Sequence, residues 1–305
     1  MSANLPWLHD AKQQFAAQRR QGTLAHAMLL PLPEADGGVL LGQFMAALAL
    51  CSSLVADVPC GHCKSCQLVN AGSHPDFHLL QADGNQIKVE QVRSLCQSLT
   101  NTAQQGGFRV ALILQCERMN MAAANALLKT LEEPGQATLL LLQSDRPAAL
   151  LPTIVSRCQQ LKIARPSPAQ LNQWLRQQYP QLDEDLGWCL PIAGGALQLA
   201  QYVADGYAAE LKKLKSAWQK SLASGHLHQK LSNLSAEQLF DVLKLLYQVL
   251  EDEMQSGQLE PLQQLQMAQL AARVMKDNQQ LMLMANVNFL ALCQSYVLEY
   301  KRLKN

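Results

Sequence analysis

Basic residues are missing from one long stretch of this chain. No Lys or Arg occurs between Arg20 and Lys64, although this stretch contains the position where an α/β nucleotide-binding domain would carry its phosphate loop. Such a loop has the pattern G-x-x-x-x-G-K-[ST], in which backbone amides cradle phosphate and the lysine reaches the terminal phosphate groups. Residues Pro31–Val39 contain Glu34 and Asp36 instead, and these carboxylates would repel a triphosphate. We therefore expect that this chain binds no ATP productively.

Long apolar runs and a strong charge of either sign are also absent. The longest apolar run, Phe44–Cys51, is far shorter than the roughly 18 residues that a membrane helix needs. The first ten residues show no basic segment followed by an apolar core, as a secretory signal would have. The net charge of +1 argues against a general electrostatic grip on nucleic acid. These absences predict a cytoplasmic protein without a membrane partner, whose nine cysteines are thiols or metal ligands and not disulfides.

In the first half of the chain, short apolar segments alternate with segments of helical spacing. The expected strands are Ala27–Leu30, Phe77–Leu80, Arg109–Leu114, Thr138–Leu142 and Gln160–Ile163. The expected helices are Ala11–Arg19, Val39–Leu50, Val89–Thr100 and Met121–Glu133. Strands that read as continuous apolar runs and alternate with helices predict an α/β domain, with a parallel sheet covered by helices on both faces.

No convincing strand follows Pro166-Ser167-Pro168, so the α/β domain is expected to span 1–165. The chain of 305 residues is long enough for two or three domains. We expect a small helical domain over 166–207 and an all-helical domain over 208–305. Their expected helices are Pro168–Gln178, Leu197–Ala204, one opened by the capping box Ser235-Ala236-Glu237-Gln238, Leu259–Met275 and Met282–Leu303.

The strongest local chemical signal is a group of four cysteines, Cys51, Cys60, Cys63 and Cys66. Two overlapping C-x-x-C spacings bring three sulfurs to one turn, and Cys51 can supply a fourth. Four thiolates suit a structural Zn²⁺ site, because a closed tetrahedral set leaves no open position for catalysis. The alternatives are four unconnected thiols or a redox pair. His62 and His74 lie nearby as substitute ligands.

Two further motifs carry a family resemblance. The string N-A-L-L-K-T-L-E-E-P over Asn125–Pro134 is followed by Ser156-Arg157-Cys158. With the four-cysteine insertion of about 51–66, these motifs resemble the AAA+ clamp-loader subunits of bacterial DNA polymerase III. The resemblance covers residues 1 to about 205, and the rest of the chain is compatible with it.

The resemblance implies both an assembly and a role for Arg157. Clamp-loader subunits form an open ring of five through a C-terminal helical collar, here 208–305, and 166–207 would be the lid domain. The partners would be motor subunits of the gamma/tau type and a delta subunit, with the sliding clamp and primer–template DNA reached through the complex. Arg157, flanked by Ser156 and Cys158, would act as an arginine finger on ATP held by a neighbouring subunit.

Three departures from a motor subunit indicate that this chain is the non-catalytic member. Besides the degenerate loop, Gln115 and Cys116 occupy the positions where the Walker B Asp-Glu pair would hold magnesium and poise water. The segment Gly194–Leu197 lacks the arginine expected of sensor 2. The alternatives are an active gamma/tau-like ATPase and a stand-alone zinc module that binds nucleic acid. The stand-alone module is disfavoured by the near-neutral net charge and because no aromatic residue, and no Lys or Arg besides Lys64, lies among the four cysteines.

Several of these residues also have a purely structural interpretation. Arg157 could be an ordinary surface ion-pair residue, and Cys158 and His26 are interpreted as packing residues. Lys129 and the Glu132–Glu133 pair belong either to a solvated face or to an interface with a neighbour. A run of lysines at helical spacing is interpreted as a solvated face in preference to a DNA contact: Lys212, Lys213, Lys215 and Lys220.

Overall fold

The computed structural model describes residues 5–105, 107–235, 238–257, 259–281 and 288–304. The chain divides into two compact units, Met1–Leu182 and Asp183–Asn305. The division falls inside the segment 166–207 that we expect to form a lid, so the three-domain division stays a prediction. Over the described ranges, no helix is both long and apolar enough to cross a membrane.

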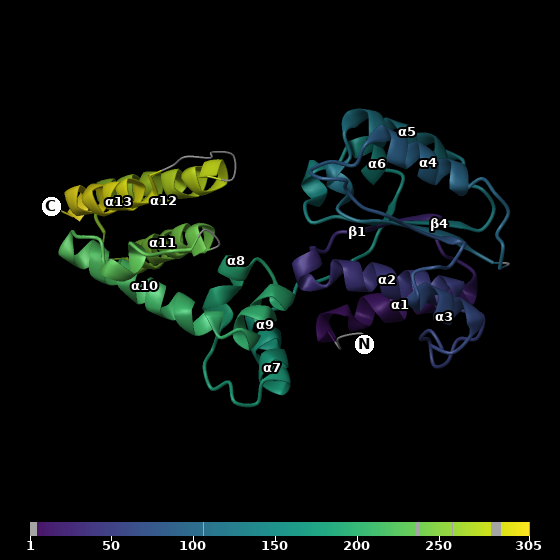
Figure 1. The fold of residues 1–305 in the computed structure, drawn as a ribbon, viewed down its shortest axis with the longest axis horizontal. Coiled ribbons are helices and arrows are strands. Elements are labelled where there is room, and N and C mark those ends of the chain that lie inside the picture. The colour runs from purple at the N-terminus through teal and green to yellow at the C-terminus, as the bar shows by residue number, and fades with distance from the viewer. Residues whose placement is uncertain (1–4, 106, 236–237, 258, 282–287, 305) are drawn as a thin grey trace. The chain divides into compact units, whose positions relative to one another are not determined.

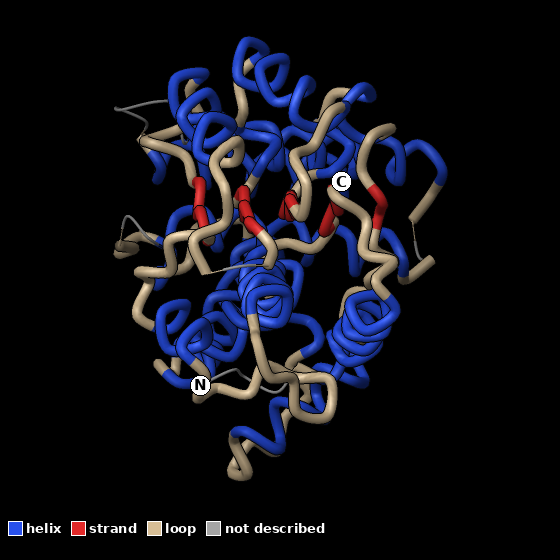
Figure 2. The backbone as a smooth tube through the Cα atoms, turned by 90° about the vertical axis from the view of Figure 1, so that its right-hand side faces the viewer, coloured by secondary structure: helices blue, strands red, loops and turns tan. Residues whose placement is uncertain are grey.

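The first unit contains a five-stranded parallel sheet. The strands are β1 (Ala27–Leu30), β2 (Phe77–Leu80), β3 (Arg109–Ile113), β4 (Thr138–Gln143) and β5 (Gln159–Gln160). They lie side by side (Figure 2), in the order β2-β3-β4-β1-β5, and every neighbouring pair is parallel. The three central strands are buried along their whole length. The predicted parallel α/β fold is confirmed, and two-sided burial explains why these strands read as apolar runs.

Helices cover both faces of this sheet (Figure 1). The helices of the unit are α1 (His9–Gln21), α2 (Gly38–Leu50), α3 (Lys64–Asn70), α4 (Val89–Ser98), α5 (Met121–Glu132), α6 (Pro152–Val155) and α7 (Pro168–Gln178). Alternate strand residues such as Leu29 and Leu140 pack with α4, α5 and α6 in one apolar cluster. Their neighbours face α1 and α2, because successive side chains in a strand point to opposite faces. Gly42 of α2 permits close packing there, since a Cβ atom at this position would lie 2.6 Å from the side chain of Leu112.

Two elements differ from the sequence expectation. The edge strand β5 is confined to Gln159 and Gln160, earlier than the expected Gln160–Ile163. Both residues are exposed, and the amide of Leu161 still donates to Leu29 O at 3.0 Å. The helix α3 was not expected, because its seven residues carry little apolar periodicity.

The second unit is entirely helical in its described residues. Its helices are α8 (Leu190–Ala193), α9 (Ala196–Ala204), α10 (Tyr207–Ser224), α11 (Gln238–Gln255), α12 (Pro261–Leu281) and α13 (Phe289–Lys304). Trp218 of α10 is fully buried, and its Nε1 donates to Val242 O of α11 at 2.8 Å. The first part of the expected helix Met282–Leu303, residues 282–287, and the capping-box residues 236–237 lie outside the described residues.

Candidate functional site

The four cysteines are brought together by the ends of two helices. Cys51 caps the C-terminus of α2. Cys63 is the N-cap of α3, where its sulfur accepts from the amide of Cys66 at 3.4 Å. The amide of Cys60 donates to the Cys51 sulfur at 3.4 Å, and the amide of Cys63 donates to the Cys60 sulfur at 3.3 Å. Backbone hydrogen bonds to the sulfurs of Cys51, Cys60 and Cys63 therefore hold them at one turn.

The spacing of the four sulfurs fits a tetrahedral metal site. All four Sγ atoms lie within 4.8 Å of one another. Cys51 Sγ and Cys63 Sγ are 3.9 Å apart, and Cys60 Sγ and Cys66 Sγ are 4.0 Å apart. Four sulfurs at the usual 2.3 Å from a zinc ion would be separated by about 3.8 Å. The four residues could therefore bind one metal ion without rearranging the loop.

The thiols of this cluster differ strongly in acidity. Burial alone would raise the pKa of Cys63, but hydrogen bonds from Ser52 and Cys66 outweigh it and hold the pKa at about 5. Burial, together with hydrogen bonds to neighbouring thiols, raises the pKa of Cys66 to about 12. Thiolates packed this closely need a cation to share their charge, and a bound divalent metal would meet that need.

Neither histidine proposed as a substitute ligand joins the four sulfurs. His62 is exposed, and its Nδ1 lies 2.8 Å from Cys60 O. His74 is buried, its Nδ1 accepts from the amide of Asp76 at 3.1 Å, and burial lowers its pKa. Among the described residues, only the four cysteines form a group with metal-ligand spacing.

In the segment between β1 and α2, at the phosphate-loop position, the backbone amides are already hydrogen-bonded within the chain. The amides of Asp36 and Gly38 both donate to Pro33 O, at 3.0 and 2.9 Å, and the amide of Gly37 donates to Glu34 O at 2.9 Å. The amide of Glu34 donates to Asp145 Oδ1 at 2.9 Å. A phosphate loop works because such amides point at the ligand. Here these four amides are used internally.

The N-terminal segment covers the same loop. A Cβ atom at Gly37 would lie 2.5 Å from the Leu5 side chain, and Trp7 Nε1 donates to Asp36 O at 2.8 Å. The Asp36 side chain is buried, with Arg165 Nε 3.9 Å from its carboxylate. We expected both Glu34 and Asp36 to repel a triphosphate. Because Asp36 is buried and Glu34 is exposed, the repulsion would come mainly from Glu34.

A polar network occupies the carboxyl ends of the central strands. Asp145 accepts from the side-chain amides of Gln143 and Gln115, at 2.8 and 3.0 Å, besides the amide of Glu34. Gln115 and Cys116 stand at the Walker B position. Cys116 is fully buried, and burial raises the pKa of its thiol well above the usual range. Neither of these two side chains supplies a carboxylate for magnesium. The sequence analysis did not single out Asp145, although an acidic residue two positions after a buried strand is a signal that could have found it.

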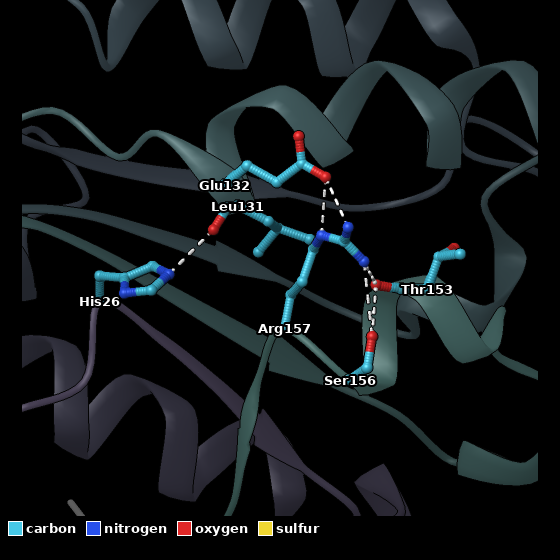
Figure 3. A network of polar contacts seen from close by, with 6 residues as sticks. All are labelled: His26, Leu131, Glu132, Thr153, Ser156 and Arg157. Atoms are coloured by element: carbon cyan, nitrogen blue, oxygen red, sulfur yellow. Dashed lines mark hydrogen bonds and ion pairs between the residues drawn. The ribbon is translucent and has the colours of Figure 1, made fainter.

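Arg157 follows α6 and lies against the end of α5 (Figure 3). Its Nη2 and Nε lie 2.6 and 2.9 Å from Glu132 Oε1. Its Nη1 donates to Thr153 O at 2.9 Å and lies 3.4 Å from Ser156 Oγ. The arginine side chain is 35% exposed and the glutamate side chain 50%. The guanidinium is thus an ion-paired surface group that a neighbouring molecule can reach.

The sequence comparisons identify a family. Residues 7–167, more than half of the chain, match the family described as "DNA polymerase III, delta subunit". A relative named DNA polymerase III subunit delta′ from Pseudomonas aeruginosa is 37% identical, over 81% of this chain and 79% of the relative. The Escherichia coli protein of the same name is 32% identical, over 76% and 71%. This chain belongs to the DNA polymerase III delta′ family.

A gamma subunit-related protein of DNA polymerase III from Thermotoga maritima aligns with a TM-score of 0.47 and 16% identity, covering 93% of this chain and 99% of that chain.

In this delta′ family member, the surroundings of His26 and Cys158 agree with their interpretation as packing residues. His26 Nε2 lies 3.0 Å from Leu131 O. Burial raises the pKa of Cys158 to about 11, so its thiol is a poor nucleophile.

Three lysines of α10 contact carboxylates of their own unit. Lys212 pairs with Glu184 at 2.7 Å, and Lys215 pairs with Asp252 at 2.9 Å. Lys213 lies 3.2 Å from Glu210, one turn away on the same helix. These pairings support the solvated-face interpretation over a DNA contact.

Proposed function

We propose that this chain is a non-catalytic subunit of a DNA polymerase III clamp loader. It supplies Arg157 in trans to ATP held by a neighbouring subunit and so supports loading of the sliding clamp onto primed DNA. The observation that carries the proposal is a reachable arginine in the S-R-C motif of a domain whose own phosphate-loop amides are already hydrogen-bonded. Family membership supports it, because relatives are named as subunits of DNA polymerase III.

The chemistry of the finger follows from the guanidinium group. Its planar fork of N–H donors binds two phosphate oxygens at once, and its permanent charge offsets the charge that develops on the γ-phosphoryl group during transfer. Ser156 and Cys158 flank it as parts of the motif. Arg157 can act only on a nucleotide held elsewhere, because the loop Pro31–Val39 lacks the lysine and four of its amides are already hydrogen-bonded within the chain.

The proposed partners are the other members of a five-subunit ring. Motor subunits of the gamma/tau type would hold the ATP, and a delta subunit would complete the ring. The helical domain 208–305 would form this chain's part of the collar, and 166–207 would be the lid domain. The sliding clamp and primer–template DNA would be reached through the assembled complex.

The metal has a structural role in this proposal. Cys51, Cys60, Cys63 and Cys66 would bind Zn²⁺, which supplies four strong bonds that hold the loop between α2 and α3 folded. A set of four thiolates leaves no open coordination position, so no step of the reaction takes place at this metal.

An active gamma/tau-like ATPase is the competing function, and the loop contacts disfavour it. Productive binding would require the amides of Glu34, Asp36, Gly37 and Gly38 to exchange their internal acceptors for phosphate. A stand-alone nucleic-acid module is disfavoured by the ion-paired lysines of α10.

The test is a clamp loader reconstituted with Arg157→Ala. We expect normal ring assembly, but DNA- and clamp-stimulated ATP hydrolysis and clamp loading lowered on the order of tenfold, since other subunits keep their own fingers. Arg157→Lys should also fail, because a point charge cannot reproduce the planar fork. Arg93→Ala, which removes another exposed arginine, should behave as wild type. Wild-type rates for both Arg157 variants would show that Arg157 is an ordinary surface residue.

A further inference from the structure

The guanidinium of Arg157 has two edges that can bind an oxyanion through paired N–H groups. The side edge consists of Nε–H and one N–H of Nη2, and the end edge consists of one N–H from each Nη atom. Glu132 Oε1 lies 2.9 Å from Nε and 2.6 Å from Nη2, so this carboxylate occupies the side edge (Figure 3). The end edge is the one left for a second oxyanion.

The remaining contacts of the Arg157 guanidinium are made by Nη1. Thr153 O accepts from Nη1 at 2.9 Å, and Ser156 Oγ lies 3.4 Å from the same nitrogen. The Ser156 hydroxyl also donates to Thr153 O at 3.2 Å, so the two acceptors lie beside each other. Among the described residues, the guanidinium forms no ion pair with a second acid. The planar group is held from two sides by the ends of α5 and α6.

The position of Glu132 is itself fixed by the fold. Glu132 is the last residue of α5, and the preceding residue, Leu131, is buried in the apolar cluster of the sheet. The Leu131 carbonyl lies 3.0 Å from His26 Nε2, which ties the end of α5 to the start of β1. An exposed carboxylate on so firmly held a backbone can orient an arginine that would otherwise sample many rotamers.

We propose that Glu132 is a positioning residue for the arginine finger: it holds the guanidinium of Arg157 by the side edge, so that the end edge stays available to the phosphate of a neighbour's nucleotide. This inference rests on the function proposed above. Orienting the group before the nucleotide arrives lowers the ordering cost that the transition state would otherwise bear. Glu132 thus acts through Arg157 and does not itself touch the substrate.

The test compares reconstituted clamp loaders carrying Glu132→Ala, Glu132→Gln and, as a matched control, Glu133→Ala. Glu133 is the adjacent exposed glutamate. We expect Glu132→Ala to lower kcat for stimulated ATP hydrolysis by roughly three- to fivefold with KM for ATP unchanged, because the interaction acts on the transition state. Glu132→Gln, which keeps an acceptor oxygen, should recover most of the rate, and Glu133→Ala should match wild type. Combining Glu132→Ala with Arg157→Ala should slow the ring no further than Arg157→Ala alone.

The outcomes separate this inference from the function on which it rests. If Arg157→Ala is slow but Glu132→Ala matches wild type or exceeds it, the finger stands and the positioning role of Glu132 is wrong. A faster Glu132→Ala ring would mean that the carboxylate holds the finger back. An additive double variant would also overturn the proposal, because Glu132 would then act independently of Arg157. If Arg157→Ala itself has no effect, both proposals fail.

Discussion

Asp145 lies where three central strands end, and its carboxylate gathers donors from three segments of the chain. The amide of Glu34 and the side chains of Gln115 and Gln143 all donate to it. A bound phosphate would draw on the same kind of donor in an active phosphate loop. In this chain the Asp145 carboxylate accepts a hydrogen bond from the Glu34 amide of the loop. A negative charge of the protein itself therefore lies beside the position that a nucleotide phosphate would occupy.

Replacing Asp145 by Ala tests this interpretation at the level of one residue. The three donors lose a charged acceptor, and we expect the free energy of unfolding to fall by about 1–3 kcal/mol. Removing this charge should not create ATP binding, because the amides of Asp36, Gly37 and Gly38 keep their acceptors. Urea unfolding measures the loss, with Glu133→Ala as a control expected to stay within about 0.5 kcal/mol of wild type. An unchanged unfolding midpoint would mean that water replaces the carboxylate fully.

Among the elements, the loop that carries the four cysteines depends most on a few side chains for its folded conformation. The loop between α2 and α3 exposes Val55 and Val58, and both Ala56 and Asp57 adopt positive φ angles of 49° and 64°. Such a loop buries too little apolar surface to fold alone, and four sulfur–metal bonds would supply the missing constraint. The sheet domain has its own apolar core and does not need the metal to form.

The consequence is a prediction about Cys63→Ser. Elemental analysis of the wild-type protein should find one zinc per chain, and the variant should lose the metal and melt at a lower temperature. Far-ultraviolet circular dichroism should still show the α/β domain, because the cluster lies outside its core. Ala103→Ser, a substitution of similar size elsewhere on the surface, serves as the control. Stoichiometric iron, or a Cys63–Cys66 disulfide in freshly purified protein, would refute the structural-zinc interpretation.

The elements also show what the sequence could and could not predict. The strands β1 and β2 match the expected bounds, because buried parallel strands are apolar runs that local pattern reveals. The edge strand β5 is polar and exposed, so a prediction based on apolar residues put this strand too far along the chain, at Gln160–Ile163. The S-R-C and N-A-L-L-K-T-L-E-E-P motifs could be recognised because each is a continuous stretch of sequence. The Arg157–Glu132 pair and the Asp145 network, in contrast, join residues from separate segments. Only the folded sheet brings those side chains together.

At the scale of the whole molecule, the proposed function places Arg157 and the ATP on which it acts in different subunits. The isolated chain should show no saturable ATP binding at millimolar ATP, because the loop lacks a lysine and its amides are already hydrogen-bonded. Isothermal titration calorimetry with magnesium present measures this directly, with a purified motor subunit as the positive control. Saturable, magnesium-dependent binding would instead favour the gamma/tau-like alternative.

The central claim is that Arg157 acts on ATP bound by another subunit. The most direct measurement is a single turnover of ATP by the reconstituted ring, stimulated by clamp and primed DNA, with wild-type or Arg157→Ala protein. The account predicts that both rings bind the same amount of ATP, while the variant ring hydrolyses part of it on the order of tenfold or more slowly, as a finger acting on one site requires. Identical amounts of bound ATP with identical hydrolysis traces would contradict the account.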